Sequence, residues 1–259
     1  MMVTADRPRR QALVTGGSAG LGRAFVKLLA ASGHAVVIVD RDPPAADSTH
    51  ERFIPCDLAR RDELDDAIDI LLQGGPYDVV ILNAGISATG HFEDMPADAL
   101  VRLIRVNAEA PLLMAATLLQ SGAIAGDGRL VFISSLSFFT GYPGAAVYAA
   151  TKDVVAVFAR SIARPCALQG ITVSAVFPGP LRTEHAERHA PQDADPARRM
   201  LPDEAARLIW RSLERGKARI VPGFAAWMFA LAGRLMPGLV TNQMKRLIYD
   251  RLGQGRWEA

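Results

Sequence analysis

The sequence has few cysteines and no apolar leader. Only two of its 259 residues are cysteine, Cys56 and Cys166, and no spacing around them suits a metal site or a disulfide framework. We interpret them as reduced, packed thiols of a cytoplasmic protein. No apolar stretch precedes Gln11, so we expect no signal peptide.

Excess charge and long apolar runs are also missing. A formal net charge of +2, with lysine and arginine scattered along the chain, excludes the basic face that binds nucleic acid. The apolar segment 224–235 is about a dozen residues long and contains Arg234. A membrane span needs roughly 20 apolar residues, so no transmembrane helix is expected. What the chain has is hydrophobic residues, 50% of the total, enough for a large core.

Short apolar runs alternate with helical patterns along most of the chain. Predicted strands are residues 12–14, 35–39, 53–54, 79–82, 130–133, 171–176 and 218–221, and predicted helices are 23–31, 62–72, 97–119, 145–163 and 202–215. Strands that are apolar on both faces and separated by helices indicate a parallel sheet covered on both sides. We predict an α/β fold with a doubly wound, seven-stranded parallel sheet of Rossmann type in three layers. No linker interrupts the alternation, so residues 1–259 are predicted to form one domain.

The first turn has the glycine spacing of a dinucleotide site. Gly16, Gly20 and Gly22 follow the first predicted strand and open the first helix, where free N–H groups favour a pyrophosphate. A plain tight turn is the alternative. Asp40 ends the second strand, and its carboxylate can accept hydrogen bonds from the adenosine ribose and repel a 2′-phosphate, which favours NAD. Arg41 could instead pair with that phosphate, so NADP stays open.

Polar residues follow later strands at the edge where open α/β sheets bind ligands. Asp57-Leu58 follows the third strand and Asn83-Ala84-Gly85 the fourth, although turn preference alone also favours these residue types. Ser135 follows the fifth strand, Tyr148 comes 13 positions later, and Lys152 lies four beyond. Residues four apart share one face of a helix, so Tyr148 and Lys152 form either a solvated pair or an acid–base pair.

These motifs, in their order and spacing, resemble the single-domain short-chain dehydrogenase/reductase family. The matching segments are TGGSAGLG at 15–22, Asp40, CDL at 56–58, NAG at 83–85, VNA at 106–108, ISS at 133–135, YAATK at 148–152 and PGPLRT at 178–183. The resemblance covers roughly residues 10–222. Two departures, Leu82 before Asn83 and Glu109-Ala110-Pro111 after VNA, concern local geometry and remove no reacting group.

The resemblance implies an NAD(P)-dependent oxidoreductase acting on a secondary alcohol or carbonyl. Tyr148 would be the general acid/base, its pKa lowered by the Lys152 ammonium and by the oxidised nicotinamide. Ser135 would hold the substrate oxygen, Lys152 would also bind the nicotinamide ribose, and Asn107 would complete a proton path to solvent. Taken singly, Ser135 could be a strand-end turn and Asn107 a helix cap. The rival function is a non-catalytic nucleotide-binding scaffold or redox sensor, which has no need for all four residues.

Cofactor contacts are expected along the same edge. They are Gly16, Ser18, Ala19, Gly20, Leu21, Gly22, Asp40, Arg41, Asp57, Leu58, Asn83, Ala84, Gly85, Tyr148, Lys152, Pro178, Gly179, Leu181 and Thr183. Thr183 could equally be a helix N-cap.

Three further features concern the substrate. Residues 184–200 are polar and are predicted to form a surface loop over the substrate. His185 and His189 in this loop could form a metal pair, but this is disfavoured because no third ligand is evident. The aromatic candidates for the pocket are Phe138, Phe139, Tyr142 and His91, with core packing as the alternative.

The C-terminal segment is predicted to be a helical extension over residues 224–259. A cover for the substrate cleft is the first hypothesis, with a subunit contact or a membrane-surface helix as alternatives. Its apolar residues hint at a hydrophobic substrate. The resemblance also implies a homodimer or homotetramer.

Overall fold

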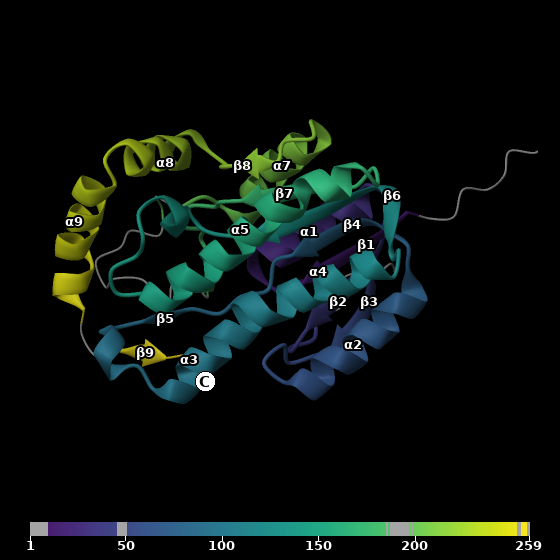
Figure 1. Cartoon of the computed structure of the whole chain (residues 1–259), viewed down its shortest axis with the longest axis horizontal. Coiled ribbons are helices and arrows are strands. Elements are labelled where there is room, and N and C mark those ends of the chain that lie inside the picture. The colour runs from purple at the N-terminus through teal and green to yellow at the C-terminus, as the bar shows by residue number, and fades with distance from the viewer. Residues whose placement is uncertain are drawn as a thin grey trace, which may run out of the picture.

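The computed structural model describes residues 10–45, 51–184, 186, 197, 199–252 and 255–257. A seven-stranded sheet has the strand order β3-β2-β1-β4-β6-β7-β8, and its neighbouring strands are parallel (Figure 1). The strands are β1 Gln11–Thr15, β2 Ala35–Asp40, β3 Glu51–Pro55, β4 Tyr77–Leu82, β6 Ile124–Ile133, β7 Thr172–Val176 and β8 Arg219–Ile220. The predicted seven-stranded parallel sheet is confirmed.

Alternate side chains of the strands enter two separate cores. Along β1, Leu13 packs on one face of the sheet, and Ala12 and Val14 pack on the other. The first face is covered by α2 Arg61–Gly74, α4 Ala110–Gln120 and α5 Ala146–Ala167, and the second by α1 Gly20–Ala31 and α7 Pro202–Glu214. Because both faces are buried, the buried part of each strand is largely apolar, and apolar runs locate strands in the sequence. The three-layer arrangement is confirmed.

Residues 97–119, predicted to form one or two long helices, contain a π-helical segment. They comprise α3 Ala97–Ile104, the π segment η2 Arg105–Glu109, and α4. Pro111, at the start of α4, has no N–H to donate to the carbonyl of Asn107 four residues earlier, so the regular hydrogen-bond pattern cannot run through this point. Such segments often occur at functional sites. Asn107 lies within it and is 1% exposed.

The C-terminal part of the chain lies at one end of the sheet. The helices α8 Phe224–Leu235 and α9 Pro237–Leu247 meet at a bend of 117° (Figure 1, yellow-green and yellow). No single helix of the described residues is long and apolar enough to cross a membrane. Taken together, α8 and α9 have the length and the apolar composition of a membrane span, but they are bent at their junction.

Short elements complete the described part of the chain. The 3₁₀ turns are η1 Phe92–Asp94, η3 Leu136–Phe139 and η5 Tyr249–Arg251. A second sheet pairs β5 Ala88–Thr89 with β9 Arg256–Trp257 in antiparallel fashion. We did not predict this sheet, because strands of two residues leave no periodic pattern in a sequence.

Candidate functional site

A cavity of about 2050 Å³ follows the carboxyl edge of the sheet. Most of the predicted site residues line it: Gly16, Ala19, Leu21, Asp40, Arg41, Asp57, Leu58, Asn83, Ala84, Gly85, Ser135, Tyr148, Lys152, Pro178, Gly179, Leu181 and Thr183. Ser18, Gly20, Gly22 and Asn107 are not part of its lining. The cavity lies where β1 adjoins β4, the point at which the strand order reverses, and ligands of such sheets bind there.

Two glycines of the first turn have no room for a side chain. A Cβ on Gly22 would lie 1.9 Å from the carbonyl oxygen of Gly16, and a Cβ on Gly16 would lie 2.9 Å from Cα of Ala84. Ala19, the N-cap of α1, makes no side-chain capping bond, and the first turn of α1 carries no acidic residue. The positive end of the helix dipole therefore faces the cavity without a competing carboxylate, as a pyrophosphate requires.

Hydrogen bonds tie this turn to the end of β4. The hydroxyl of Thr15 accepts the N–H groups of Asn83 and Ala84, both at 3.0 Å. The Asn83 amide donates to the carbonyls of Thr15 at 3.0 Å and Gly16 at 3.2 Å. Asn83 thus holds two loops in register as well as lining the cavity. We did not predict the part played by Thr15, which looks like an ordinary strand residue in the sequence.

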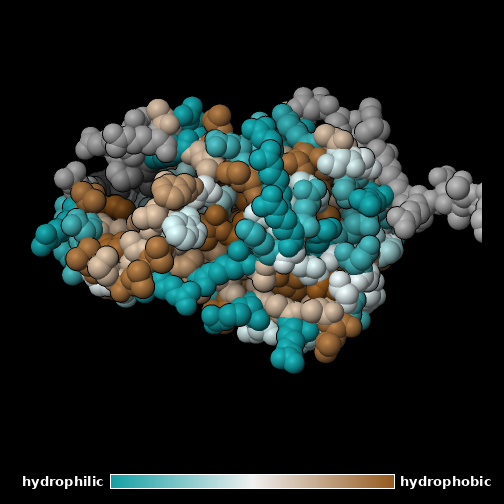
Figure 2. Space-filling model, turned by 90° about the horizontal axis from the view of Figure 1, so that it is seen from above, coloured by the Kyte–Doolittle hydropathy of each residue, from teal (hydrophilic) through white to brown (hydrophobic). Residues whose placement is uncertain are grey.

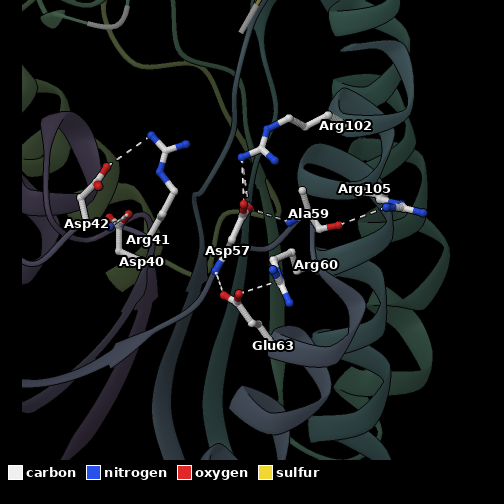
Figure 3. Close-up of polar contacts among 9 residues, drawn as sticks. All are labelled: Asp40, Arg41, Asp42, Asp57, Ala59, Arg60, Glu63, Arg102 and Arg105. Carbon is white, nitrogen blue, oxygen red and sulfur yellow. Dashed lines mark hydrogen bonds and ion pairs between the residues drawn. The ribbon is translucent and has the colours of Figure 1, made fainter. Parts of the chain in front are cut away.

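Asp40 lies beside the glycine-rich turn. Its carboxylate accepts the N–H of Ser18 at 2.9 Å, and the Ser18 hydroxyl donates to the carbonyl of Asp42 at 2.6 Å. Arg41 pairs with Asp42 at 3.4 Å, and both side chains are exposed (Figure 3). Asp40 is thus held at the cavity wall, and Arg41, which also lines the cavity, has an exposed side chain.

Asp57 is bound by groups of the protein itself. The Arg102 guanidinium donates to its two oxygens at 3.0 and 3.2 Å, and the N–H of Ala59 donates at 3.0 Å (Figure 3). Burial acts to raise the pKa of Asp57, but the Ala59 and Arg102 hydrogen bonds outweigh it and hold that pKa below its usual value. Arg102 lines the cavity and was not predicted, because it lies on α3, 45 residues from Asp57 in the sequence.

The tyrosine and lysine of α5 are not a solvated pair. Lys152 is 5% exposed, and its ammonium donates to the carbonyl of Ile133 at 3.1 Å. A Cβ on Gly85 would lie 2.7 Å from this nitrogen, so the ammonium sits between the ends of β4 and β6. Tyr148 and Ser135 both line the cavity, and Ser135 is near enough to affect the pKa of Tyr148.

Burial changes the acidity of both groups. It raises the pKa of Tyr148 to about 12, against the opposing effect of the Ser135 hydrogen bond, and the neighbouring Tyr142 adds to the rise. It lowers the pKa of Lys152 to about 8. The net rise in the pKa of Tyr148 is opposite to the fall expected from Lys152 together with an oxidised nicotinamide, because among the protein's own groups the desolvation of the phenolate is the largest effect. Tyr148 is therefore a protonated phenol at neutral pH.

Asn107 connects the loop after β4 with α5. Its side-chain oxygen accepts the N–H of Ile86 at 2.8 Å, and its amide donates to the carbonyl of Ile86 at 2.9 Å and to the Thr151 hydroxyl at 3.1 Å. These contacts make it an internal brace rather than a helix cap. The proton path through Asn107 stays a prediction.

The aromatic candidates divide between pocket and core. Tyr142 lines the cavity, but Phe138 and Phe139 do not. They pack with Phe177 around the guanidinium of Arg219, which lies 4.7–5.5 Å from the three ring centres. The core-packing alternative therefore describes both phenylalanines.

The His91 ring packs against Tyr249 and does not line the cavity. The centres of the two rings are 4.6 Å apart. His185 and His189 lie outside the described residues. Within the described part of the chain, no cluster of three metal-ligating side chains occurs.

The far end of the cavity is apolar. Ala226 and Phe229 of α8, Met244 of α9 and Ile248 just after it line this end together with Leu136. This placement agrees with the hypothesis that the C-terminal helices cover the cleft. The sequence indicated the segment by its composition, but did not indicate which of its side chains turn inward.

Comparison with known proteins agrees with this arrangement. The profile of the family described as short chain dehydrogenase matches residues 10–194. The chain belongs to the short-chain dehydrogenase family. It is 34% identical over 176 residues to the 3-oxoacyl-[acyl-carrier-protein] reductase MabA of Mycobacterium tuberculosis, covering 68% of this chain and 70% of that protein.

Two other similar proteins match a larger share of this chain. The cyclic-di-GMP-binding biofilm dispersal mediator protein of Escherichia coli is 30% identical, covering 83% of this chain and 87% of its own. The solved short-chain dehydrogenase of Sphingobium yanoikuyae, in complex with NADPH, is 27% identical with a TM-score of 0.73, covering 90% and 96% of the two chains. The family assignment supports an oxidoreductase that uses a nicotinamide cofactor.

Proposed function

We propose that this oxidoreductase interconverts a secondary alcohol and its carbonyl compound, and that the substrate has an apolar body. The observation that carries the proposal is that Ser135 and Tyr148 line the same cavity wall as the buried Lys152. From this pair the cavity extends one way to the glycine-rich turn and the other way to the apolar side chains of α8. A cofactor and an apolar substrate can therefore approach the pair from opposite ends.

A nicotinamide dinucleotide fits the residues present. The close-packed turn at Gly16 and Gly22 would receive the pyrophosphate at the start of α1. Asp40 would accept hydrogen bonds from the adenosine ribose, which favours NAD. If NADP is used, the exposed Arg41 would pair with its 2′-phosphate. The solved Sphingobium structure is a complex with NADPH. When bound, the nicotinamide donates or accepts the hydride.

Tyr148 moves the proton. In reduction its phenol donates to the carbonyl oxygen, and in oxidation the phenolate takes the proton from the alcohol. Ser135 holds the same oxygen by a hydrogen bond, and the charge of Lys152 stabilises the phenolate that reduction leaves behind. The raised pKa keeps Tyr148 protonated at neutral pH, so reduction begins from the protonation state it needs. Asn107 keeps the loop around Gly85 and Ile86 against α5.

Replacing Tyr148 by phenylalanine tests this mechanism. Tyr148→Phe is expected to bind NADH within about twofold of the parent and to lose at least roughly a hundredfold in turnover, because the proton donor is gone. The control is Tyr77→Phe, which removes a buried hydroxyl that donates to the carbonyl of Leu71, away from the cavity. Turnover of Tyr148→Phe at the parent rate would refute the assigned role.

A panel of ketones and alcohols with NADH and NADPH tests the substrate class. In a series of ketones of increasing chain length, kcat/KM is expected to rise about fourfold per methylene until the apolar end is filled, since each buried methylene contributes about 0.8 kcal/mol. The rival function, a nucleotide-binding scaffold, has a counterpart in the E. coli relative, whose name describes a binding protein. Cofactor binding without turnover of any panel member would favour that rival.

A further inference from the structure

We propose that α8 and α9 dock on an anionic lipid bilayer and hold the apolar end of the cavity against it. Exposed apolar side chains are concentrated there: of the fifteen large ones among the described residues, eight lie within residues 224–247. On α8, Trp227, Met228, Leu231 and Leu235 are exposed, whereas Ala230 is buried. A helix that is apolar on its outer face as well as its inner face marks an interaction surface.

Exposed apolar side chains occur on both helices. Leu239 and Leu247 of α9 are 59% and 54% exposed and extend the apolar surface beyond the bend. Figure 2 shows apolar atoms gathered at the end of the molecule where Figure 1 places α8 and α9. The surface therefore belongs to two helices at an angle, and not to one isolated side chain.

The charge of this surface selects the occupant. The charged residues between 224 and 249 are Arg234, Lys245 and Arg246, all basic and all exposed, and the sequence has no Asp or Glu in that interval. Lys245 reaches Asp250, just beyond the interval, at 2.7 Å. Basic residues beside apolar side chains suit anionic headgroups over an acyl layer. A second copy of the chain would bring the same basic residues together across a two-fold axis, which disfavours it.

The dimensions indicate helices that lie on the membrane rather than cross it. The helices have 12 and 11 residues, so they are roughly 18 and 17 Å long at 1.5 Å per residue. The hydrocarbon core is about 30 Å thick. The bend of 117° prevents the pair from forming one longer rod.

The inner faces of the same helices connect this surface with the site. Phe229 and Met244 line the cavity, and a Cβ on Gly233 would lie 2.5 Å from the Thr140 side chain. The Thr241 hydroxyl donates to the carbonyl of Thr140, in the loop that leads to α5. Docking would thus set the apolar entrance of the cleft on the bilayer. Delivery of a membrane-dissolved carbonyl substrate through this entrance rests on the proposed function.

Vesicle co-sedimentation of the full chain tests the docking surface. The parent is expected to sediment with vesicles of phosphatidylcholine and phosphatidylglycerol, and the double variant Leu231→Asp/Leu235→Asp to bind them at least about tenfold more weakly. The matched control is Leu168→Asp, because Leu168 is 85% exposed but lies at the end of α5. This control is expected to bind within about twofold of the parent, and all three proteins to keep NADH binding.

Other outcomes overturn the proposal. A parent that ignores the anionic vesicles overturns it, as does equal sedimentation of parent and double variant. If the double variant also changes a dimer into a monomer in light scattering while the parent ignores vesicles, the occupant is a second copy. Because vesicle binding is measured without substrate, its outcome is independent of whether the proposed reaction occurs.

Discussion

Replacing Lys152 by methionine is expected to stabilise the fold while removing turnover. Burial lowers the pKa of this lysine from 10.5 to about 8, and the side chain is 5% exposed. At about 1.4 kcal/mol per pH unit, a charged Lys152 costs the folded state roughly 3 kcal/mol near pH 7. Methionine fills a similar volume without charge but leaves the carbonyl of Ile133 without its donor, which costs about 1 kcal/mol. The expected net gain in the free energy of unfolding is about 2 kcal/mol.

The pH dependence of stability identifies the cause. Because the pKa of Lys152 is lower in the folded than in the unfolded state, the folded protein binds fewer protons between about pH 8 and pH 10.5. The destabilisation of the folded protein by the charged Lys152 therefore disappears as the pH rises through this interval. Methionine has no proton to lose, so the advantage of Lys152→Met is expected to shrink over the same interval.

Urea unfolding followed by circular dichroism, near pH 7 and near pH 10, measures this difference. The control Lys217→Met removes an exposed lysine and is expected to change stability by less than about 0.5 kcal/mol. A variant no more stable than the parent near pH 7 would refute the reasoning, and so would an advantage that persists undiminished near pH 10. Retained turnover in Lys152→Met would contradict the assigned role of the ammonium.

Three further substitutions test the cofactor site and the contact with Lys152. Gly22→Ala places a Cβ 1.9 Å from a backbone oxygen, so titration calorimetry is expected to find NADH affinity reduced at least about tenfold, and urea unfolding a loss of about 2 kcal/mol. Gly126→Ala, whose nearest neighbour would be 3.9 Å away, is the control and should change neither by as much. Gly85→Ala would place a Cβ 2.7 Å from the Lys152 nitrogen and displace that nitrogen by roughly 1 Å. Steady-state kinetics should then give a kcat loss of about a hundredfold with a smaller loss of cofactor affinity. Equal losses of kcat and cofactor affinity would contradict the geometry. Asp40→Ser is expected to raise the NADPH-to-NADH ratio of kcat/KM at least about tenfold, and an unchanged ratio would show that Asp40 does not select the cofactor.

Local rules were enough to predict the sheet and the main motifs. Strands buried on both faces are largely apolar, so the apolar runs within β1, β2 and β4 stand out in the sequence. Helical period alone puts Tyr148 and Lys152 on one face. The glycines of the first turn are recognisable because a backbone contact such as that between Gly22 and Gly16 excludes every side chain.

Contacts between distant segments could not be predicted in this way. Arg102 binds Asp57 across 45 residues, and the Thr15 hydroxyl binds the N–H of Asn83 across 68. Neither pair leaves a pattern in the chain, since only the packing of separate elements brings the partners together.

The acidity of the site and the exposure of the C-terminal helices were likewise decided by tertiary structure. The sequence by itself determined the fold class, the order of the motifs and the apolar composition of α8. Whether Tyr148 is a phenol or a phenolate depends on the desolvation contributed by every surrounding segment, and burial reversed the expected direction. The outward position of Leu231 and the inward position of Phe229 depend on how α8 packs. Residue types and their spacing follow from the chain alone, whereas burial is a sum over neighbours that only the folded molecule supplies.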